Sequence, residues 1–425
     1  MKHSILIIGF ILLLSAHSQA DTLSLHYCHE QAILKSPEQQ QLTWLESLKA
    51  LQVSNLRLQN LPQWQVILQA TYQSDAVTFN PGIPMMEGIE VPKDQYRGEL
   101  SLQQKLFDGG KLKSEIVTQE LNIQTQQQQV QVNLYQIKEV INRLYFSALI
   151  LQENEKLLRA SVLKELENRL ASIRSKVANG VLLKSNANGL EIEILKVKQQ
   201  ITQISYEKQS MLKMLAKWTE DPKVPEATLT LPEVALSSTE IKPNSLRPEY
   251  QLFALQQQYL ESKKKRMTLQ KMPDLHVFGT LGIGQPNPLN FFETEFEPYY
   301  LVGLRLTWQP VSYGRWNREQ ESLSLQQQIV LSEQENFDKQ LTISLTQEHE
   351  ELQKLKALIL SEKQMISLQK EQVNTSASQL ANGVITSTGY ITELNRQTAF
   401  QLQLQIHEIQ QVQTLVNQLT KQGKF

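Results

Sequence analysis

The sequence predicts a mainly α-helical chain with a small β part, built as two copies of one structural unit. Three observations predict this fold class. Apolar residues recur every seven positions over two very long stretches, paired shorter runs alternate between polar and apolar residues, and landmark residues recur in the same order in both halves. A seven-residue spacing is typical of helices that pack on helices, and strict alternation is typical of strands with one apolar face.

The composition of the 425 residues excludes several classes of function. The net charge of −1 argues against a nucleic-acid partner, since nucleic-acid binders carry a basic excess. His26, Cys28 and His29 form the densest group of metal-ligand types, but a second pair of ligands is missing, so we interpret them as part of an ordinary first helix. The sequence contains no catalytic motif that we credit, so we expect no enzyme activity, no cofactor and no metal.

Residues 1–20 have the pattern of a secretory signal peptide. Lys2 precedes a run of ten apolar residues, and the small residues Ser18 and Ala20 suit cleavage before Asp21. The run is too short to form a membrane-spanning helix, which needs about 20 apolar residues. We therefore expect the chain to be exported.

The mature chain is predicted to contain a first repeat at 21–220, a linker at 221–244 and a second repeat at 245–425. Pro62 recurs as Pro273, 211 residues later, and the motif Asn-Gly-Val recurs after 203 residues. The small loss of length between these landmarks is what a shortened loop would produce. Four prolines in the linker disfavour regular structure there.

Each repeat is expected to contain a helix, two strands, a long helix and a further helix. The expected strands cover about 63–75, 95–107, 274–284 and 299–309. The expected long helices cover 111–178 and 314–381, and the helices that follow cover 182–218 and 385–420. A helix of 68 residues rises about 100 Å, so it belongs to a tube or a rod and not to a compact globule.

The four expected strands have one apolar face, and their terminal aromatic residues fit strands that cross an outer membrane. We expect the polar face to line a lumen, with these residues on it: Gln65, Gln69, Arg97, Lys105 and Arg305. Four strands cannot close a barrel, and open edges in lipid are costly, so other copies of the chain must complete it. Two copies would give eight strands and a filled barrel, whereas three would give twelve strands and a lumen, which the polar face favours.

The sequence resembles the TolC-type outer-membrane efflux family over nearly the whole mature chain. The signal peptide, the duplicated unit, the sequence Phe107-Asp108-Gly109-Gly110-Lys111 and the paired Asn-Gly-Val turns carry this resemblance. It implies a homotrimer in the outer membrane of a Gram-negative bacterium, with a twelve-stranded β-barrel that continues into a long antiparallel α-helical barrel in the periplasm. It also implies passive export of cargo from an inner-membrane pump through a periplasmic adaptor protein.

The resemblance further implies roles for the turns between helices. Contact with the adaptor carries over to the residues at the two turns, which are Gly180, Val181, Gly383 and Val384. Family members often carry an aspartate six residues after the turn glycine, where this chain has Asn186 and Gly389. A periplasmic constriction lined by Asn186, Thr388 or Thr392 would therefore select ions by charge less strongly than one lined by aspartates.

Two other interpretations stay open. The chain could be a soluble periplasmic coiled-coil structural protein whose hairpin strands pack against its own helices, because such hairpins also alternate in polarity. It could also be the adaptor partner, but an adaptor would carry its helical hairpin once, with several small β domains around it. Neither alternative explains duplicated strand pairs with aromatic ends.

Overall fold

The computed structural model describes residues 22–79, 82, 89–234, 246–290 and 292–425, so the expected signal peptide lies outside the described residues. The described chain forms two compact units. We call Gln40–Val132 with Pro248–Phe337 the strand unit. The described parts of Met1–Gln39, Asn133–Arg247 and Asp338–Phe425 form the hairpin unit. Among the described residues, no helix is both long enough and apolar enough to cross a membrane.

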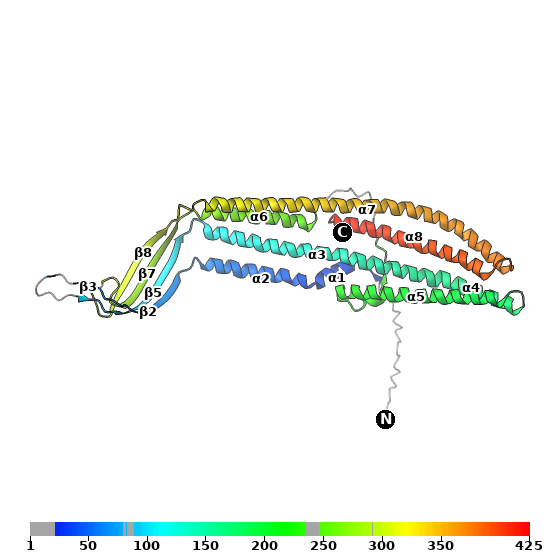
Figure 1. The fold of residues 1–425 in the computed structure, drawn as a ribbon, viewed down its shortest axis with the longest axis horizontal. Coiled ribbons are helices and arrows are strands. Elements are labelled where there is room, and N and C mark those ends of the chain that lie inside the picture. Colours follow the sequence, from blue (N-terminus) through cyan, green and yellow to red (C-terminus); the bar gives the residue numbers. More distant parts are fainter. Residues whose placement is uncertain (1–21, 80–81, 83–88, 235–245, 291) are drawn as a thin grey trace, which may run out of the picture. The chain divides into compact units, whose positions relative to one another are not determined.

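The strand unit contains one four-stranded sheet (Figure 1). Its strands lie in the order β2 (Gln63–Tyr72), β5 (Asp94–Phe107), β7 (Asp274–Gln285) and β8 (Glu297–Thr307). Each neighbouring pair is antiparallel. The central pair joins β5 to β7, so strands from the two halves of the sequence hydrogen-bond to each other. All four strands begin and end within three residues of the positions expected from the alternating pattern.

The register of the sheet gathers the apolar side chains on one face. Val66, Leu100, Leu281 and Tyr300 lie opposite one another in a single row across all four strands. These side chains are exposed in the chain, and Leu68, on the same face of β2, is 82% exposed. Burial of such surface stabilises a protein by roughly 25 cal/mol per Å², so covering this face with an apolar environment would be favourable.

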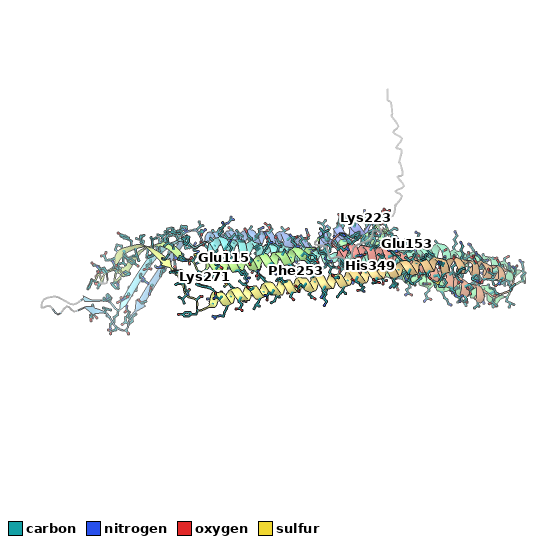
Figure 2. The ribbon with its side chains drawn as sticks, turned by 90° about the horizontal axis from the view of Figure 1, so that it is seen from above. Glu115, Glu153, Lys223, Phe253, Lys271 and His349 are labelled. Atoms are coloured by element: carbon teal, nitrogen blue, oxygen red, sulfur yellow. The ribbon has the colours of Figure 1, made fainter. Side chains whose placement is uncertain are left out.

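Four helices accompany the sheet in the strand unit. They are α2 (Pro37–Leu58), α6 (Pro248–Leu269) and the first parts of α3 (Lys111–Leu157) and α7 (Arg315–Ala381). Phe253 of α6 packs against Phe337 of α7 with 5.9 Å between ring centroids, and Arg266 of α6 pairs with Glu115 of α3 at 3.3 Å. Figure 2 labels Phe253 and Glu115. The second expected long helix, 314–381, is a single continuous helix, α7.

The hairpin unit consists of α1 (Leu25–Lys35), the last parts of α3 and α7, and three further helices. These are α4 (Lys164–Ala178), α5 (Lys184–Thr219) and α8 (Ser387–Lys421). Figure 1 shows α4 beside α5 and α7 beside α8, and the pair Lys363–Glu408 joins the latter two helices at 2.9 Å. The core of this unit contains Leu166, Leu190 and Tyr390, none of which is accessible to solvent.

The first expected long helix, 111–178, is interrupted by a short π-helical segment at Leu158–Leu163. Leu158, Val162, Leu166 and Leu170 are all buried and follow one another at steps of four. A regular α-helix has 3.6 residues per turn, so such a run would drift out of the core. The wider π turn adds a residue and brings the apolar stripe back toward the core.

A two-stranded parallel sheet ties the N-terminal segment to the described part of the linker. Strand β1 (Thr22–Leu23) pairs with β6 (Thr228–Leu229), a short pairing that the sequence did not predict. The Tyr145 hydroxyl on α3 lies 2.7 Å from the Leu23 carbonyl oxygen and 2.6 Å from the Thr230 carbonyl oxygen. Burial raises the pKa of Tyr145 to about 12, so this hydroxyl keeps its proton and anchors both segments.

Candidate functional site

Both Asn-Gly-Val sequences form the same helix-ending turn. Gly180 has φ of 72° and Gly383 has φ of 73°, a region that favours glycine. The Val181 N–H donates to the Lys176 carbonyl oxygen at 2.9 Å, and the Val384 N–H donates to the Gln379 carbonyl oxygen at the same distance. Each bond spans five residues and satisfies a carbonyl group at a helix end. The two valine side chains are 67% and 70% exposed.

The two turns contact each other within the hairpin unit. The Lys176 side chain donates to the Ala381 carbonyl oxygen at 2.6 Å. A Cβ atom placed on Gly383 would lie 3.6 Å from Leu182 Cδ2, which is ordinary van der Waals contact. The structure therefore joins both sequence-predicted turns into one surface, which we call the tip.

Asn186 connects the two helical hairpins just behind the tip. Its Oδ1 accepts a hydrogen bond from the backbone N–H of Ser387 at 2.9 Å, and both residues are buried. The N-cap residue of α8, Thr386, makes no side-chain cap bond, so Asn186 of α5 supplies an acceptor in its place. Gly189 permits this approach, because a Cβ atom there would lie 2.8 Å from Ser387 Oγ.

The three residues expected at a constriction therefore have different surroundings. Asn186 is engaged between the hairpins, a contact that neither the turn motif nor the helical pattern indicates. Thr388 and Thr392 are exposed on α8, and the Thr392 hydroxyl donates to the Thr388 carbonyl oxygen at 2.9 Å. A pore-lining role stays a prediction for all three residues.

We expect Asn186→Ala to loosen the start of α8. The substitution leaves the buried Ser387 N–H without its acceptor, which costs about 1–3 kcal/mol. Hydrogen exchange of peptides covering residues 382–392 should then accelerate about fivefold or more. Asn188→Ala, an exposed position on the same helix, is the matched control. Equal exchange in the two variants would contradict the capping role.

The five polar strand residues named from the sequence lie on one face of the sheet. Gln69 of β2 lies opposite Arg97 of β5. Side chains an even number of residues apart on one strand share a face, so Gln65 lies on the same face as Gln69, and Lys105 on the same face as Arg97. Arg305 joins them because it lies opposite His276, which in turn lies opposite Lys105. The structure thus brings Arg305 of β8 together with residues of β2 and β5 that lie at least 200 positions earlier in the sequence.

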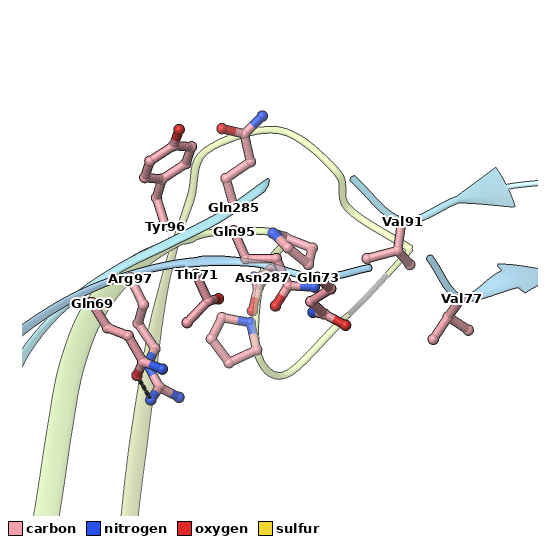
Figure 3. A pocket seen from close by; sticks show the side chains of 12 residues that line it. Gln69, Thr71, Gln73, Val77, Val91, Gln95, Tyr96, Arg97, Gln285 and Asn287 are labelled. Carbon is pink, nitrogen blue, oxygen red and sulfur yellow. Dashed lines mark hydrogen bonds between the residues drawn. The ribbon is translucent and has the colours of Figure 1, made fainter. Parts of the chain in front are cut away.

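At the loop end of this face is a cavity of about 460 Å³ (Figure 3). Carboxamide groups dominate its lining, with Gln69, Gln73, Gln95 and Gln285 among them. The Arg97 guanidinium donates to the Gln69 side-chain oxygen at 2.5 Å, a bond that Figure 3 marks. Arg97 Nε also lies 3.3 Å from Glu99 Oε1, so a neighbouring carboxylate offsets the positive charge here.

His26, Cys28 and His29 lie on α1 in different surroundings. His26 pairs with Glu30 at 3.1 Å on the surface, whereas Cys28 and His29 are buried. His29 Nε2 lies 2.8 Å from the side-chain oxygen of Asn142. In the part of the chain that the structure describes, no group of three or more side chains could hold a metal ion.

Burial lowers the pKa of His29 to about 4, and the nearby Lys138 charge acts in the same direction, although the hydrogen bond to Asn142 opposes both. Between pH 6.5 and 4 the unfolded chain therefore binds more protons at this position than the folded chain. We expect stability to be greatest above pH 6.5 and to fall by about 3 kcal/mol toward pH 4 because of this group.

Unfolding of the detergent-solubilised protein across this pH range checks the expectation. His29→Gln should flatten the pH dependence, whereas His26→Gln, a change at a largely exposed side chain, should leave it unchanged. An identical pH dependence in the parent protein and in His29→Gln would show that the buried imidazole does not cause it.

Comparison with known proteins identifies the fold. No protein-family model and no curated protein sequence matches the chain. Among solved structures, the outer membrane protein VceC from Vibrio cholerae matches with a TM-score of 0.68 and 14% identity, over 94% of this chain and 96% of that one. CusC, a protein that changes conformation as it folds and forms a transmembrane channel, matches with a TM-score of 0.71 and 10% identity, over 94% of this chain and 92% of that one.

A third match is the open state of the outer membrane channel MtrE from Neisseria gonorrhoeae. Its TM-score is 0.63 at 13% identity, over 94% of this chain and 89% of that one. The single chain therefore has the fold of these outer-membrane proteins, and the expected mainly α-helical fold with a small β part is confirmed. Identities this low show the fold alone.

Proposed function

We propose that the chain forms the outer-membrane exit duct of a tripartite export system in a Gram-negative bacterium. Three copies close a twelve-stranded β-barrel in the outer membrane, and their helices form an α-helical barrel in the periplasm. The duct conducts cargo passively and has no chemistry of its own. An inner-membrane pump and a periplasmic adaptor supply the cargo and the energy.

One observation carries this proposal: the four-stranded sheet has two open edges and an exposed apolar face. Among the described strands, β2 and β8 each have a neighbour on one side only. Three successive antiparallel pairings make β8 antiparallel to β2. Copies related by rotation about an axis along the barrel can thus pair β8 of one copy with β2 of the next, and no open edge is left.

The two faces of the sheet favour a barrel with lipid on its outside and water on its inside. Tyr300, Val302 and Leu304 are each at least 68% exposed on the apolar face of β8, which suits contact with acyl chains. The opposite face carries the polar residues from Gln65 to Arg305 described above. Twelve such strands leave a lumen instead of a barrel filled by side chains.

The tip suits the binding of a protein partner in the periplasm. Val181 and Val384 each expose an apolar side chain on one of two turns that contact each other. The adaptor is the partner that fits this surface.

The alternative function is that of a soluble periplasmic coiled-coil protein. The long helices favour it, but the exposed apolar face of the sheet would then contact water. Membrane fractionation separates the two proposals: recovery entirely in the soluble periplasmic extract would reject the duct.

We expect Gly383→Val to reduce export while trimers still form in the membrane. A β-branched residue at φ of 73° costs about 1–2 kcal/mol, which lowers the ratio of native to non-native turn about five- to thirtyfold. An export assay in cells that depend on this protein measures the first effect, and crosslinking of the membrane fraction measures the second.

Gly383→Asn is the matched control, because asparagine tolerates the left-handed region better than other side chains. It should retain most of the export activity. Unchanged export by Gly383→Val, with the protein present at the normal level, would contradict the assignment of the tip to the adaptor.

A further inference from the structure

The polar face of the sheet carries a row of basic side chains at the end nearest the first residues of α3. Lys105 on β5 lies opposite His276 on β7, and His276 lies opposite Arg305 on β8. We call these three residues the basic row. They come from both halves of the sequence, and only the register of the sheet brings them together.

The charge of the basic row is not offset by its surroundings. Among the described residues, neither Lys105 nor Arg305 lies in an ion pair. The Arg305 guanidinium lies over the Phe278 ring, with 4.7 Å between them. Asp274, the nearest acidic residue along β7 on this face, is held by Lys111 at 2.7 Å.

The opposite end of the same face has a different charge balance. Arg97 lies 3.3 Å from Glu99, and the row that contains Arg97 ends on β8 at Glu297. The face is therefore basic at one end and close to neutral or acidic at the other. A charge gradient of this kind orients charged solutes that pass along it.

A cavity of about 440 Å³ adjoins the basic row within the strand unit. Its lining combines Lys105 and His276 with four carboxamide side chains, those of Asn55, Gln59, Gln63 and Gln103. Gln103 Nε2 lies 3.1 Å from His276 Nδ1, which holds the imidazole in place. Gln63 Nε2 already donates to the carbonyl oxygens of Leu58 and Leu61, so Asn55 and Gln59 are the carboxamides whose N–H groups face a ligand. With the Lys105 cation and no carboxylate in the lining, this combination suits carboxylate or phosphate groups.

We propose that the basic row and this cavity form an anion-binding site on the lumen face, and that the duct favours anionic cargo. This inference rests on the proposed function, because three copies would place six permanent positive charges from Lys105 and Arg305 around one lumen. Carboxylate and phosphate cargo share the required chemistry. The apolar face of the sheet is the one suited to lipid, so the site faces cargo and not the membrane.

Planar bilayers that contain the full-length protein test the selectivity. With a potassium chloride gradient whose dilute side is about 10 mM, the Debye length is about 30 Å and fixed charges act across a wide lumen. The reversal potential should show a preference for chloride. The double variant Lys105→Gln, Arg305→Gln should lower the chloride-to-potassium permeability ratio about threefold or more, whereas Lys105→Arg should retain it.

Direct binding provides a second measurement that does not depend on an open pore. Pyrophosphate is the probe, and its phosphorus NMR line should broaden in the presence of the detergent-solubilised protein and much less with the double variant. Equal broadening by both proteins, or by neither, would overturn the anion site. A conducting channel whose selectivity is the same in the double variant would overturn the cargo preference while leaving the duct in place.

Discussion

Hydrogen bonding at the two open edges of the sheet is the constraint on which the rest of the structure depends. An unsatisfied backbone group in a hydrocarbon environment costs several kcal/mol, whereas whole domains are stable by only about 5–15 kcal/mol. Strands β2 and β8 cannot both remain open in a membrane. In the proposed assembly, closure by further copies would satisfy the edges, turn the apolar face toward lipid and enclose the polar face, so one arrangement would account for all three features of the sheet.

Helix packing in the hairpin unit determines where the two turns of the tip lie. Two helical hairpins must end together if their turns are to form one surface, and turn glycines alone do not ensure this. The buried contact between Asn186 and Ser387 and the close approach at Gly189 fix the start of α8 against α5. The positions of Val181 and Val384 thus depend on residues behind the tip as well as on the turns.

The sequence predicted features whose signals are local. The alternation of side chains located all four strands, and the Asn-Gly-Val motifs located both turns, because period and left-handed glycines are read from neighbouring residues. The π-helical segment at Leu158–Leu163 was not predicted, since it depends on the fit of a long stripe to its core. The basic row also escaped prediction, because pairing Lys105 with His276 requires the register of strands far apart in the sequence.

The decisive measurement is the protein mass of the detergent-extracted particle, obtained by light scattering with the detergent contribution subtracted. For a barrel closed by three copies, it should be three times the mass of the chain without residues 1–20. A monodisperse monomer would contradict it, because the edges of β2 and β8 would then have no strand partners and the sheet could not lie in a membrane. The coiled-coil alternative would then explain the long helices better.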